Sequence, residues 1–187
     1  LMRADVSDEA QVRSMFREYF SIYDTLDVLV NNAGISLIRV IQDTTLADWN
    51  KIFAVNMNGA FLCSRAVADR MIGNGGGCII NVSSIWGEVG ASCEVAYSAS
   101  KGALIAFTKA LAKELAPSKV RVNCVSPGVI DTQMNSDLTG DEMEQLVAQI
   151  PMGRIGNPEE VARACVYLSD AEYVTGEVLS VGGGFGK

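Results

Sequence analysis

Four short apolar runs, each closed by turn-forming residues, constrain the fold of this 187-residue chain more than any other feature. The runs cover residues 26–30, 78–82, 120–125 and 177–181. Short apolar runs bounded by Gly, Asn, Ser or Pro are typical of strands buried on both faces of a parallel sheet. Parallel strands need crossover connections, which are usually helical and right-handed. The sequence therefore predicts an α/β fold with a doubly wound parallel sheet.

Helical patterns fill the stretches between these runs. The segment Ser7-Asp8-Glu9 is typical of an N-cap followed by an acidic first turn. The pattern that begins at Leu46 is long, and we expect it to be bent or broken. The predicted helices cover residues 7–21, 46–72, 95–115, 141–149 and 158–168. No second domain, repeat or linker is visible, so residues 1–187 are predicted to form a single domain.

The composition excludes several classes of function. A net charge of −7 disfavours nucleic acid and anionic membranes as partners. The chain has no histidine, which argues against a Ser-His-Asp hydrolase and against most zinc sites, so no metal is expected. Its five cysteines include no Cys-x-x-Cys pair, and neither a membrane span nor a signal peptide is visible. We therefore expect a cytoplasmic protein with reduced thiols.

Polar or glycine-rich residues follow each predicted strand. These are Asp5 after the opening segment, residues 31–34, Ser83 and Ser84, residues 126–128 and residues 182–184. Any one of them could be a turn that needs Gly, Asn or Ser for backbone reasons. Ligands bind beyond the carboxyl ends of parallel strands, so we expect the five groups to converge on one cleft.

Tyr97 and Lys101 are spaced by one helical turn in the helix that follows the second run. A phenol with an ordinary pKa of about 10 transfers protons poorly near neutral pH. A cation beside it favours the phenolate and lowers its pKa toward the working range. The same pair could be an ordinary exposed Tyr/Lys pair on an amphipathic helix.

Motifs along nearly the whole chain resemble those of the short-chain dehydrogenase/reductase family. The matching segments are Asn31-Asn32-Ala33-Gly34, Val55-Asn56, Asn81-Val82-Ser83-Ser84, Tyr97-Ser98-Ala99-Ser100-Lys101, Pro127-Gly128-Val129-Ile130-Asp131-Thr132 and Thr175-Gly176-Glu177-Val178-Leu179. The resemblance implies an NAD(P)-dependent oxidoreductase in which the cofactor provides the hydride.

The resemblance also implies a role for individual residues. Tyr97 would donate a proton to the substrate carbonyl oxygen, and Lys101 would lower the Tyr97 pKa and hydrogen-bond the nicotinamide ribose. Ser84 would hold the carbonyl oxygen, and Asn56 would order a water that leads to Lys101. Asp5 and Val6 would contact the adenine. The residues implied in cofactor binding are Asp5, Val6, Asn32, Ala33, Gly34, Tyr97, Lys101, Pro127, Gly128, Ile130 and Thr132.

Ser83 is the rival of Ser84 for the catalytic role. The thirteen-residue spacing to Tyr97 favours Ser84. Neighbouring strand residues point to opposite faces, so only one of the two serines can serve. We expect Ser83 to have a packing or hydrogen-bonding role behind the site.

The family begins with a strand and a Gly-rich turn that binds the pyrophosphate, and no such segment occurs in this sequence. Residues 73–77 are glycine-rich, but they follow a helix and precede a strand. We expect a Rossmann-like sheet that lacks its first βαβ portion, in an N-terminally truncated form of an enzyme of about 240 residues, inactive by itself. The residue that selects NAD or NADP belongs to the lacking segment, and NADP(H) is expected rather than NAD(H).

Two subfamilies are similar to this chain. Residues 150–162 and 131–134 resemble 3-oxoacyl-[acyl-carrier-protein] reductases, which implies a ketone carried on acyl carrier protein, although residues 73–77 lack the basic residues usual there. Residues 84–88 and 90–94 resemble reductases of the 5-aminopentanone modification on elongation factor P. Glu88 and Glu94 would suit that cationic amino-ketone, or they are solvated loop residues.

Two further properties of this chain stay open from its sequence: whether it is catalytic, and how its subunits assemble. It could be a non-catalytic fragment or an interaction module instead of an enzyme. Members of the family it resembles usually form homotetramers through their two long helices and last strand, so a homotetramer is expected of the full-length form. Six apolar residues of the substrate loop could contact a ligand or simply pack in the core: Met134, Leu138, Met143, Leu146, Ile150 and Met152.

Overall fold

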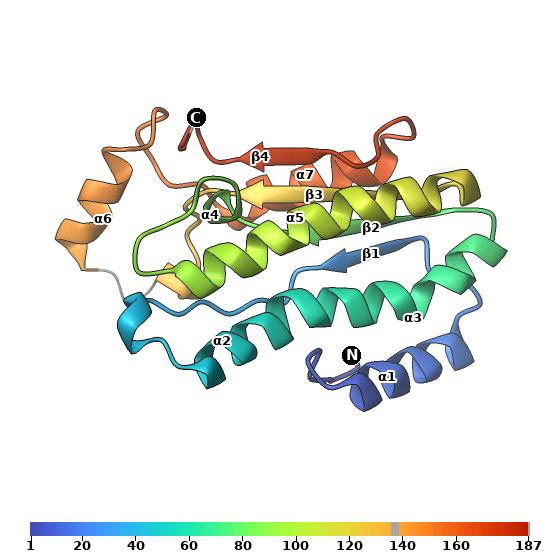
Figure 1. Ribbon diagram of the computed structural model, residues 1–187. Helices are drawn as coiled ribbons and strands as arrows, with labels where there is room; N and C mark the ends of the chain where they lie inside the picture. Colours follow the sequence, from blue (N-terminus) through green and yellow to red (C-terminus); the bar gives the residue numbers. More distant parts are fainter. Residues whose placement is uncertain (136–138, 187) are drawn as a thin grey trace.

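Parallel strands form the central sheet of the computed structural model, which describes residues 1–135 and 139–186 (Figure 1). Within these residues the strands are β1 (Val28–Asn31), β2 (Gly77–Val82), β3 (Val120–Pro127) and β4 (Val178–Val181), paired in sequence order. Ile80 of β2 lies beside Val30 of β1 and Asn123 of β3. The four predicted strands are confirmed, with ends displaced by no more than two residues.

Helices account for most of the remaining described chain. They are α1 (Glu9–Ile22), α2 (Leu46–Phe53), α3 (Gly59–Gly73), α4 (Ile85–Val89), α5 (Val95–Leu115), α6 (Gly140–Val147) and α7 (Pro158–Asp170). A π-helical turn, η2 (Ala54–Asn58), joins α2 to α3, and 3-10 turns occur at η1 (Ile41–Asp43), η3 (Ala116–Ser118) and η4 (Gln133–Asn135). Leu138 of the predicted substrate loop lies outside the described residues.

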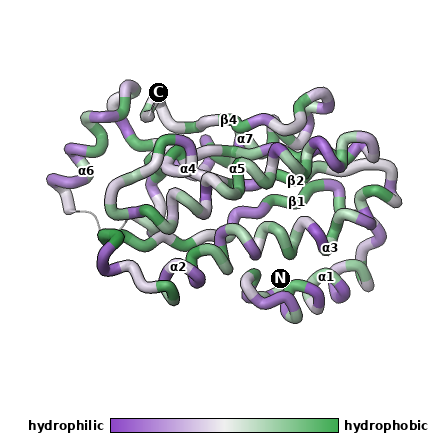
Figure 2. Tube along the Cα trace, in the orientation of Figure 1, coloured by the Kyte–Doolittle hydropathy of each residue, from purple (hydrophilic) through white to green (hydrophobic). Residues whose placement is uncertain are grey.

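Side-chain caps fix where several helices begin. Asp8 accepts hydrogen bonds from Ala10 N and Gln11 N, which confirms the predicted start of α1. Thr45 caps α2 and Asn157 caps α7, each with an acidic residue three positions on that completes a capping box. Figure 2 shows hydrophobic and hydrophilic segments alternating along α1, as expected of a helix with one buried face.

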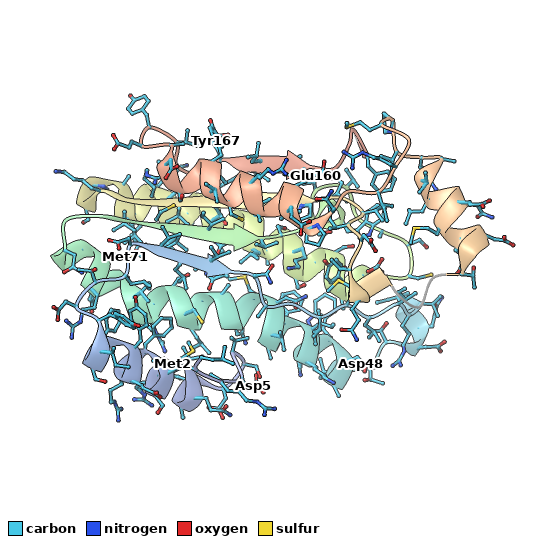
Figure 3. The ribbon with its side chains drawn as sticks, turned by 180° about the vertical axis from the view of Figure 1, so that it is seen from behind. Met2, Asp5, Asp48, Met71, Glu160 and Tyr167 are labelled. Carbon is cyan, nitrogen blue, oxygen red and sulfur yellow. The ribbon has the colours of Figure 1, made fainter. Side chains whose placement is uncertain are left out.

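Alternate residues of the strands face two separate cores. Ile79 packs with side chains of α1, α3 and α5, such as Val12, Val67 and Ala112. Its neighbour Ile80 faces the other way and packs against α7. Seen from behind in Figure 3, α7 with Glu160 and Tyr167 lies in front of the sheet. Helices therefore cover both faces, as the α/β prediction requires.

The crossover through α7 differs from the expectation of uniformly right-handed connections. The strands follow one another in order, yet α3 and α5 cover one face and α7 covers the other. The α7 connection must then have the opposite hand to the two before it. The connection between β3 and α7 is long, and its described residues are 128–135 and 139–157. The prediction of a right-handed crossover throughout was wrong.

The long helical region 46–72 is interrupted, as predicted. Its break is η2, where the helix widens for five residues around Asn56. Such π-turns inside helices frequently occur at functional sites. Asn56 is 1 % exposed, so the break turns a polar side chain into the interior at the carboxyl end of the sheet. Among the described helices, none combines the length and the apolar character needed to cross a membrane.

Candidate active site

Ser84 lies at the junction between β2 and α4. It is the N-cap of α4, and its hydroxyl oxygen accepts a hydrogen bond from Trp86 N at 3.2 Å. Ser83 instead donates from Oγ to the main-chain oxygen of Lys101 at 2.8 Å. Ser83 is thus hydrogen-bonded to the backbone of α5, as predicted for it, while the Ser84 side chain acts on Tyr97 and lowers the pKa of its phenol.

Tyr97 and Lys101 share the buried face of α5. They are 6 % and 4 % exposed, so the interpretation as an exposed pair is wrong. Lys101 Nζ lies 5.7 Å from the centroid of the Tyr97 ring and donates to the main-chain oxygen of Val82 at 2.8 Å. The structure therefore brings Ser84, Tyr97 and Lys101 together at the carboxyl end of β2.

Burial dominates the protonation of this pair. It raises the pKa of the Tyr97 phenol, the hydrogen bond with Ser84 acts in the opposite direction, and the Glu94 charge raises the pKa further. Burial also lowers the pKa of Lys101 from 10.5 to about 8. Burial and the Glu94 charge therefore act together on the Tyr97 pKa, and together they outweigh the opposing effect of Ser84.

Asn56 connects three parts of the site through its side-chain amide. Its Oδ1 accepts from Ile35 N at 2.8 Å, and its Nδ2 donates to Ile35 O at 2.9 Å and to Ser100 Oγ at 3.0 Å. Ser100 in turn donates to the Tyr97 carbonyl at 2.7 Å. Both amide protons are used by protein atoms, so Asn56 holds the loop after β1 against α5.

Gly34 stands directly against the same groups. A Cβ atom at this position would lie 3.2 Å from Lys101 Nζ and 3.5 Å from Asn56 Oδ1. Only a residue without a side chain leaves this approach open. The Asn31–Gly34 turn therefore reaches the Lys101 amine, as the sequence predicts for a shared cleft.

A cavity of about 170 Å³ opens between the end of β1, η2 and α1. Its lining includes three of the predicted cofactor-binding residues, Val6, Asn32 and Ala33. Asp5 precedes the lining residue Val6 in the segment before α1 (Figure 3), and it accepts from Ser7 N at 2.9 Å and from Ser7 Oγ at 2.7 Å. These bonds lower the pKa of the Asp5 carboxyl, which favours its charged form.

The ends of β3 and β4 approach each other very closely. A Cβ on Gly128 would lie 2.7 Å from Gly182 Cα, and Gly128 N donates to Val181 O at 3.0 Å. Beyond Pro127 and Gly128, Ile130 forms an isolated bridge with Gly156 and has a buried side chain. Thr132 is exposed, and its hydroxyl contacts the Ile130 carbonyl at 3.5 Å.

Sequence reasoning missed a buried polar chain beneath the site. Asn31 Nδ2 donates to Ser64 Oγ at 3.0 Å and to Asn81 Oδ1 at 2.8 Å, and Asn81 Nδ2 donates to Thr108 Oγ1 at 2.8 Å. The signal was an asparagine inside an apolar run, because a buried amide requires partners. Ser126, which belongs to the predicted group 126–128, is buried at the end of β3, and its hydroxyl has no hydrogen-bond partner in the described part of the chain.

A second missed feature is the contact between α4 and α5. A Cβ on Gly87 would lie 2.7 Å from the Lys101 carbonyl carbon and 2.9 Å from Gly102 N. Gly102 would in turn place a Cβ 3.2 Å from the Gly87 oxygen. The two backbones are therefore in direct contact one turn after Ser84, which fixes Ser84 relative to the residues of α5.

The two acidic residues near the site have different surroundings. Glu88 Oε1 accepts a hydrogen bond from Ser180 Oγ of β4 at 3.0 Å. Glu94 is half-buried before α5, and burial raises the pKa of its carboxyl. Glu94 also acts electrostatically on Tyr97.

The apolar residues of the predicted substrate loop fall into two groups. Ile150 packs in a buried cluster with Ile85, Val129 and Phe185, and Leu146 packs against it. Met134 and Met152 are exposed. Ile150 and Leu146 of the loop therefore pack in the core, whereas Met134 and Met152 are accessible to solvent.

Comparison with known proteins is consistent with this geometry. The family model described as "Enoyl-(Acyl carrier protein) reductase" matches residues 1–186. The 3-oxoacyl-[acyl-carrier-protein] reductase FabG of Aquifex aeolicus is 43 % identical over 178 residues, covering 94 % of this chain and 72 % of that protein. Cyclopentanol dehydrogenase of a Comamonas species is 42 % identical, and the match covers 98 % of this chain and 75 % of that protein.

The fold has a close match among solved structures. The crystal structure of a gluconate 5-dehydrogenase from Burkholderia cenocepacia, in complex with NADP and tartrate, superposes with a TM-score of 0.93. It is 33 % identical, and the match covers 96 % of this chain and 72 % of that one. The chain therefore belongs to the short-chain dehydrogenase/reductase family of NAD(P)-dependent oxidoreductases.

Proposed function

We propose that this protein reduces a ketone to a secondary alcohol, with Tyr97 as the proton donor to the carbonyl oxygen. The observation that carries the proposal is the cluster of Ser84, Tyr97 and Lys101 at the carboxyl end of β2, held by the bonds described above. When bound, the nicotinamide supplies the hydride that adds to the carbonyl carbon.

The side chains of this protein would carry out the proton transfer and stabilise the charge on the carbonyl oxygen. Tyr97, whose raised pKa keeps it protonated at neutral pH, gives its proton to the carbonyl oxygen. The Ser84 hydroxyl donates a hydrogen bond to the same oxygen and stabilises its developing charge. Lys101 holds positive charge beside Tyr97 and returns a proton to it after reduction. Asn56 would support the water that supplies Lys101 through an oxygen atom, because both of its amide protons are donated to protein atoms.

NADP(H) is the proposed cofactor. The cavity lined by Val6, Asn32 and Ala33 offers an apolar wall and main-chain groups suited to the adenine end. Asp5, Gly34, Pro127, Gly128, Ile130 and Thr132 would complete the binding surface. The NADP bound to the Burkholderia structure supports this choice over NAD(H).

The proposed substrate is a 3-oxoacyl group carried on acyl carrier protein. The names of several similar proteins, such as that of Aquifex aeolicus, support it. The test is a spectrophotometric assay of NADPH oxidation with acetoacetyl-acyl carrier protein, using the native polypeptide that contains this sequence. Turnover in the native protein that is lost in Tyr97→Phe supports the proposal, and equal turnover in both rules it out.

A second candidate substrate is the 5-aminopentanone modification on elongation factor P. Glu94 favours it, because a half-buried carboxylate beside Tyr97 would pair with a substrate ammonium group. Glu94→Gln separates the two candidates. It should lower kcat/KM for the amino-ketone at least tenfold and leave the value for acetoacetyl-acyl carrier protein within twofold.

A third candidate is a non-catalytic fragment or interaction module. It predicts no NADPH oxidation with any ketone and no effect of Tyr97→Phe. The buried positions of Asn56, Ser84, Tyr97 and Lys101 support the enzyme over this candidate.

We also infer a cytoplasmic homotetramer. The five cysteines are free thiols, which suits a reducing compartment. Phe61 of α3 is exposed, and such an apolar side chain on a long helix suits a contact between subunits. Light scattering of the native protein would give the mass of four chains, and a monomer mass would exclude the tetramer.

A further inference from the structure

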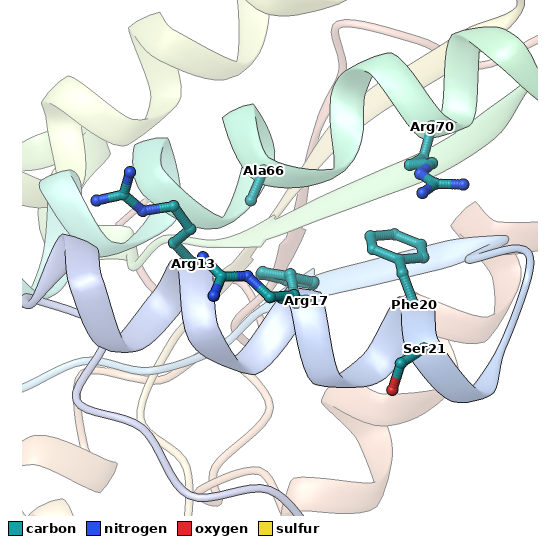
Figure 4. Close-up of a pocket in the computed structure, with 7 residues that line it drawn as sticks. Arg13, Arg17, Phe20, Ser21, Ala66 and Arg70 are labelled. Carbon is teal, nitrogen blue, oxygen red and sulfur yellow. The ribbon is translucent and has the colours of Figure 1, made fainter.

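A groove of about 430 Å³ lies between α1 and α3 (Figure 4). Its lining includes Arg13, Phe16, Arg17 and Phe20 of α1 and Arg70 of α3. Arg70 lies fourteen residues after Asn56, or about 20 Å along the helical axis. The groove is therefore distant from the carboxyl edge of the sheet where Tyr97 and Lys101 meet.

Three arginines line this groove without a carboxylate partner, with Arg13 and Arg70 at its two ends and Arg17 between them (Figure 4). Arg13 and Arg17 are one turn apart on α1, and Arg70 approaches from α3. The ion pairs found in residues 1–135 and 139–186 do not involve these three arginines. The neighbouring Arg65, by contrast, pairs with Glu9 at 2.7 Å. In a chain of net charge −7, this local excess of positive charge favours an anion.

The groove also presents aromatic surface. The Phe16 and Phe20 rings stack with centroids 6.3 Å apart, and the Arg70 guanidinium lies 5.1 Å from the Phe20 centroid. A cation–π contact orients the guanidinium without removing its charge. The groove thus combines positive charge at its rim with apolar contact along the two rings.

We infer that this groove is a second ligand site, which binds an amphipathic organic anion with a phosphate or carboxylate head group and an apolar body. Guanidinium groups bind both kinds of head group through paired hydrogen bonds. The volume is in the range of small-molecule sites, about 300–1,000 Å³. Phe16 is the one residue that this groove shares with the lining of the cofactor cavity, as both are described.

Isothermal titration of the native protein that contains this sequence with octyl phosphate tests the proposal. Sodium octanoate distinguishes a carboxylate from a phosphate source. Two controls each carry one part of the ligand: inorganic phosphate has the head group alone, and 1-octanol has the apolar body alone. The expected result is saturable binding of one octyl anion per chain, at least tenfold tighter than binding of either part. Absence of binding, or equal binding of inorganic phosphate, would overturn the proposal.

Variants locate the binding. Arg17→Gln and Arg70→Gln should each weaken octyl phosphate binding at least fivefold, whereas Arg17→Lys, which keeps the charge, should weaken it less. The matched control is Arg163→Gln, which removes an exposed arginine of α7 on the other face of the sheet. All three positions are exposed, and thermal unfolding confirms that the variants fold. Binding that is unchanged in Arg17→Gln and Arg70→Gln would place the ligand elsewhere and reject the site.

Discussion

Lys101 donates a hydrogen bond from Nζ to the main-chain oxygen of Val82 at 2.8 Å. The Ser83 hydroxyl makes the reverse connection, donating to the main-chain oxygen of Lys101 at 2.8 Å. Two bonds thus join Val82, the last residue of β2, and Ser83, which follows it, to one residue of α5. They hold the helix at a fixed depth relative to Ser84, the residue that follows Ser83.

Tyr97→Phe tests the role of the phenol with little change in packing. The ring is retained and only the hydroxyl is lost, so the fold should persist. Loss of a general acid should lower kcat for ketone reduction by about 10²–10⁴-fold. The measurement is steady-state NADPH oxidation by the native protein, with Tyr167→Phe, an exposed tyrosine of α7, as the control. Equal kcat for both variants would contradict the assignment.

Lys101→Met should stabilise the protein while it removes activity. The depression of the Lys101 pKa from 10.5 to about 8 corresponds to about 3 kcal/mol of cost for the buried ammonium at pH 7. The variant removes this cost but loses the bond to Val82, which contributes about 1 kcal/mol. A net gain of about 1–2 kcal/mol in the free energy of unfolding is expected.

The pH dependence gives this prediction a second readout. Between pH 8 and 10.5 the unfolded chain keeps the lysine proton that the folded chain releases, so stability rises with pH in this window. Lys101→Met should lack that rise, and Lys109→Met, which removes an exposed lysine of the same helix, should keep it. Chemical denaturation at pH 7 and pH 9.5 compares the three proteins. Parallel changes in all three would mean that Lys101 does not titrate as described.

The sequence was sufficient for features with a local signal. Strands such as 78–82 could be predicted because a short apolar run between turn residues has few other solutions, and Asp8 marks the start of α1 by its own hydrogen bonds. The helix α4 has five residues, too few for a periodic pattern, and it was missed. The bond between Asn31 and Asn81 joins residues fifty positions apart, so only the folded chain reveals it. The spacing of Tyr97 and Lys101 indicates their proximity but not the extent of their burial, so the rise in the Tyr97 pKa caused by burial could not be predicted from the sequence.

Asn81→Ala tests the buried polar chain. Asn81 is fully buried and connects Asn31 to Thr108, so its loss leaves an amide donor and a hydroxyl without their partner and creates a cavity. The free energy of unfolding should fall by about 2–4 kcal/mol. Thr108→Val, which keeps the shape, should cost less. The control is Asn50→Ala on the exposed face of α2, expected to change stability by no more than about 0.5 kcal/mol. Urea denaturation measures the free energy of unfolding of all three variants. A similar small change in each would show that the buried polar chain of Asn31, Asn81 and Thr108 contributes little to stability.

Gly87→Ala tests whether the contact between α4 and α5 sets the catalytic geometry. The added Cβ would lie 2.7 Å from the Lys101 carbonyl carbon, which is backbone and cannot rotate away. The helix α4 must therefore move, and Ser84 moves with it as its N-cap. Overpacking of this kind costs about 1–3 kcal/mol of stability. A displacement of about 1 Å at the reacting groups lowers the rate by up to about 10²-fold, so kcat should fall at least tenfold.

Two further glycines separate this positioning effect from a general effect of alanine. Gly102→Ala places its Cβ 3.2 Å from the Gly87 oxygen and should reduce kcat by a smaller factor than Gly87→Ala. Gly73→Ala, at the end of α3, meets nothing within 4 Å and should leave kcat unchanged, with stability equal or higher by up to about 1 kcal/mol. If the backbone contact beside Lys101 positions Ser84, the loss of kcat should be largest for Gly87→Ala, smaller for Gly102→Ala and absent for Gly73→Ala. Thermal unfolding of each variant, measured beside kcat, separates this effect from a loss of stability. A Gly87→Ala enzyme that turned over like Gly73→Ala would show that Ser84 is held in place by something other than this contact.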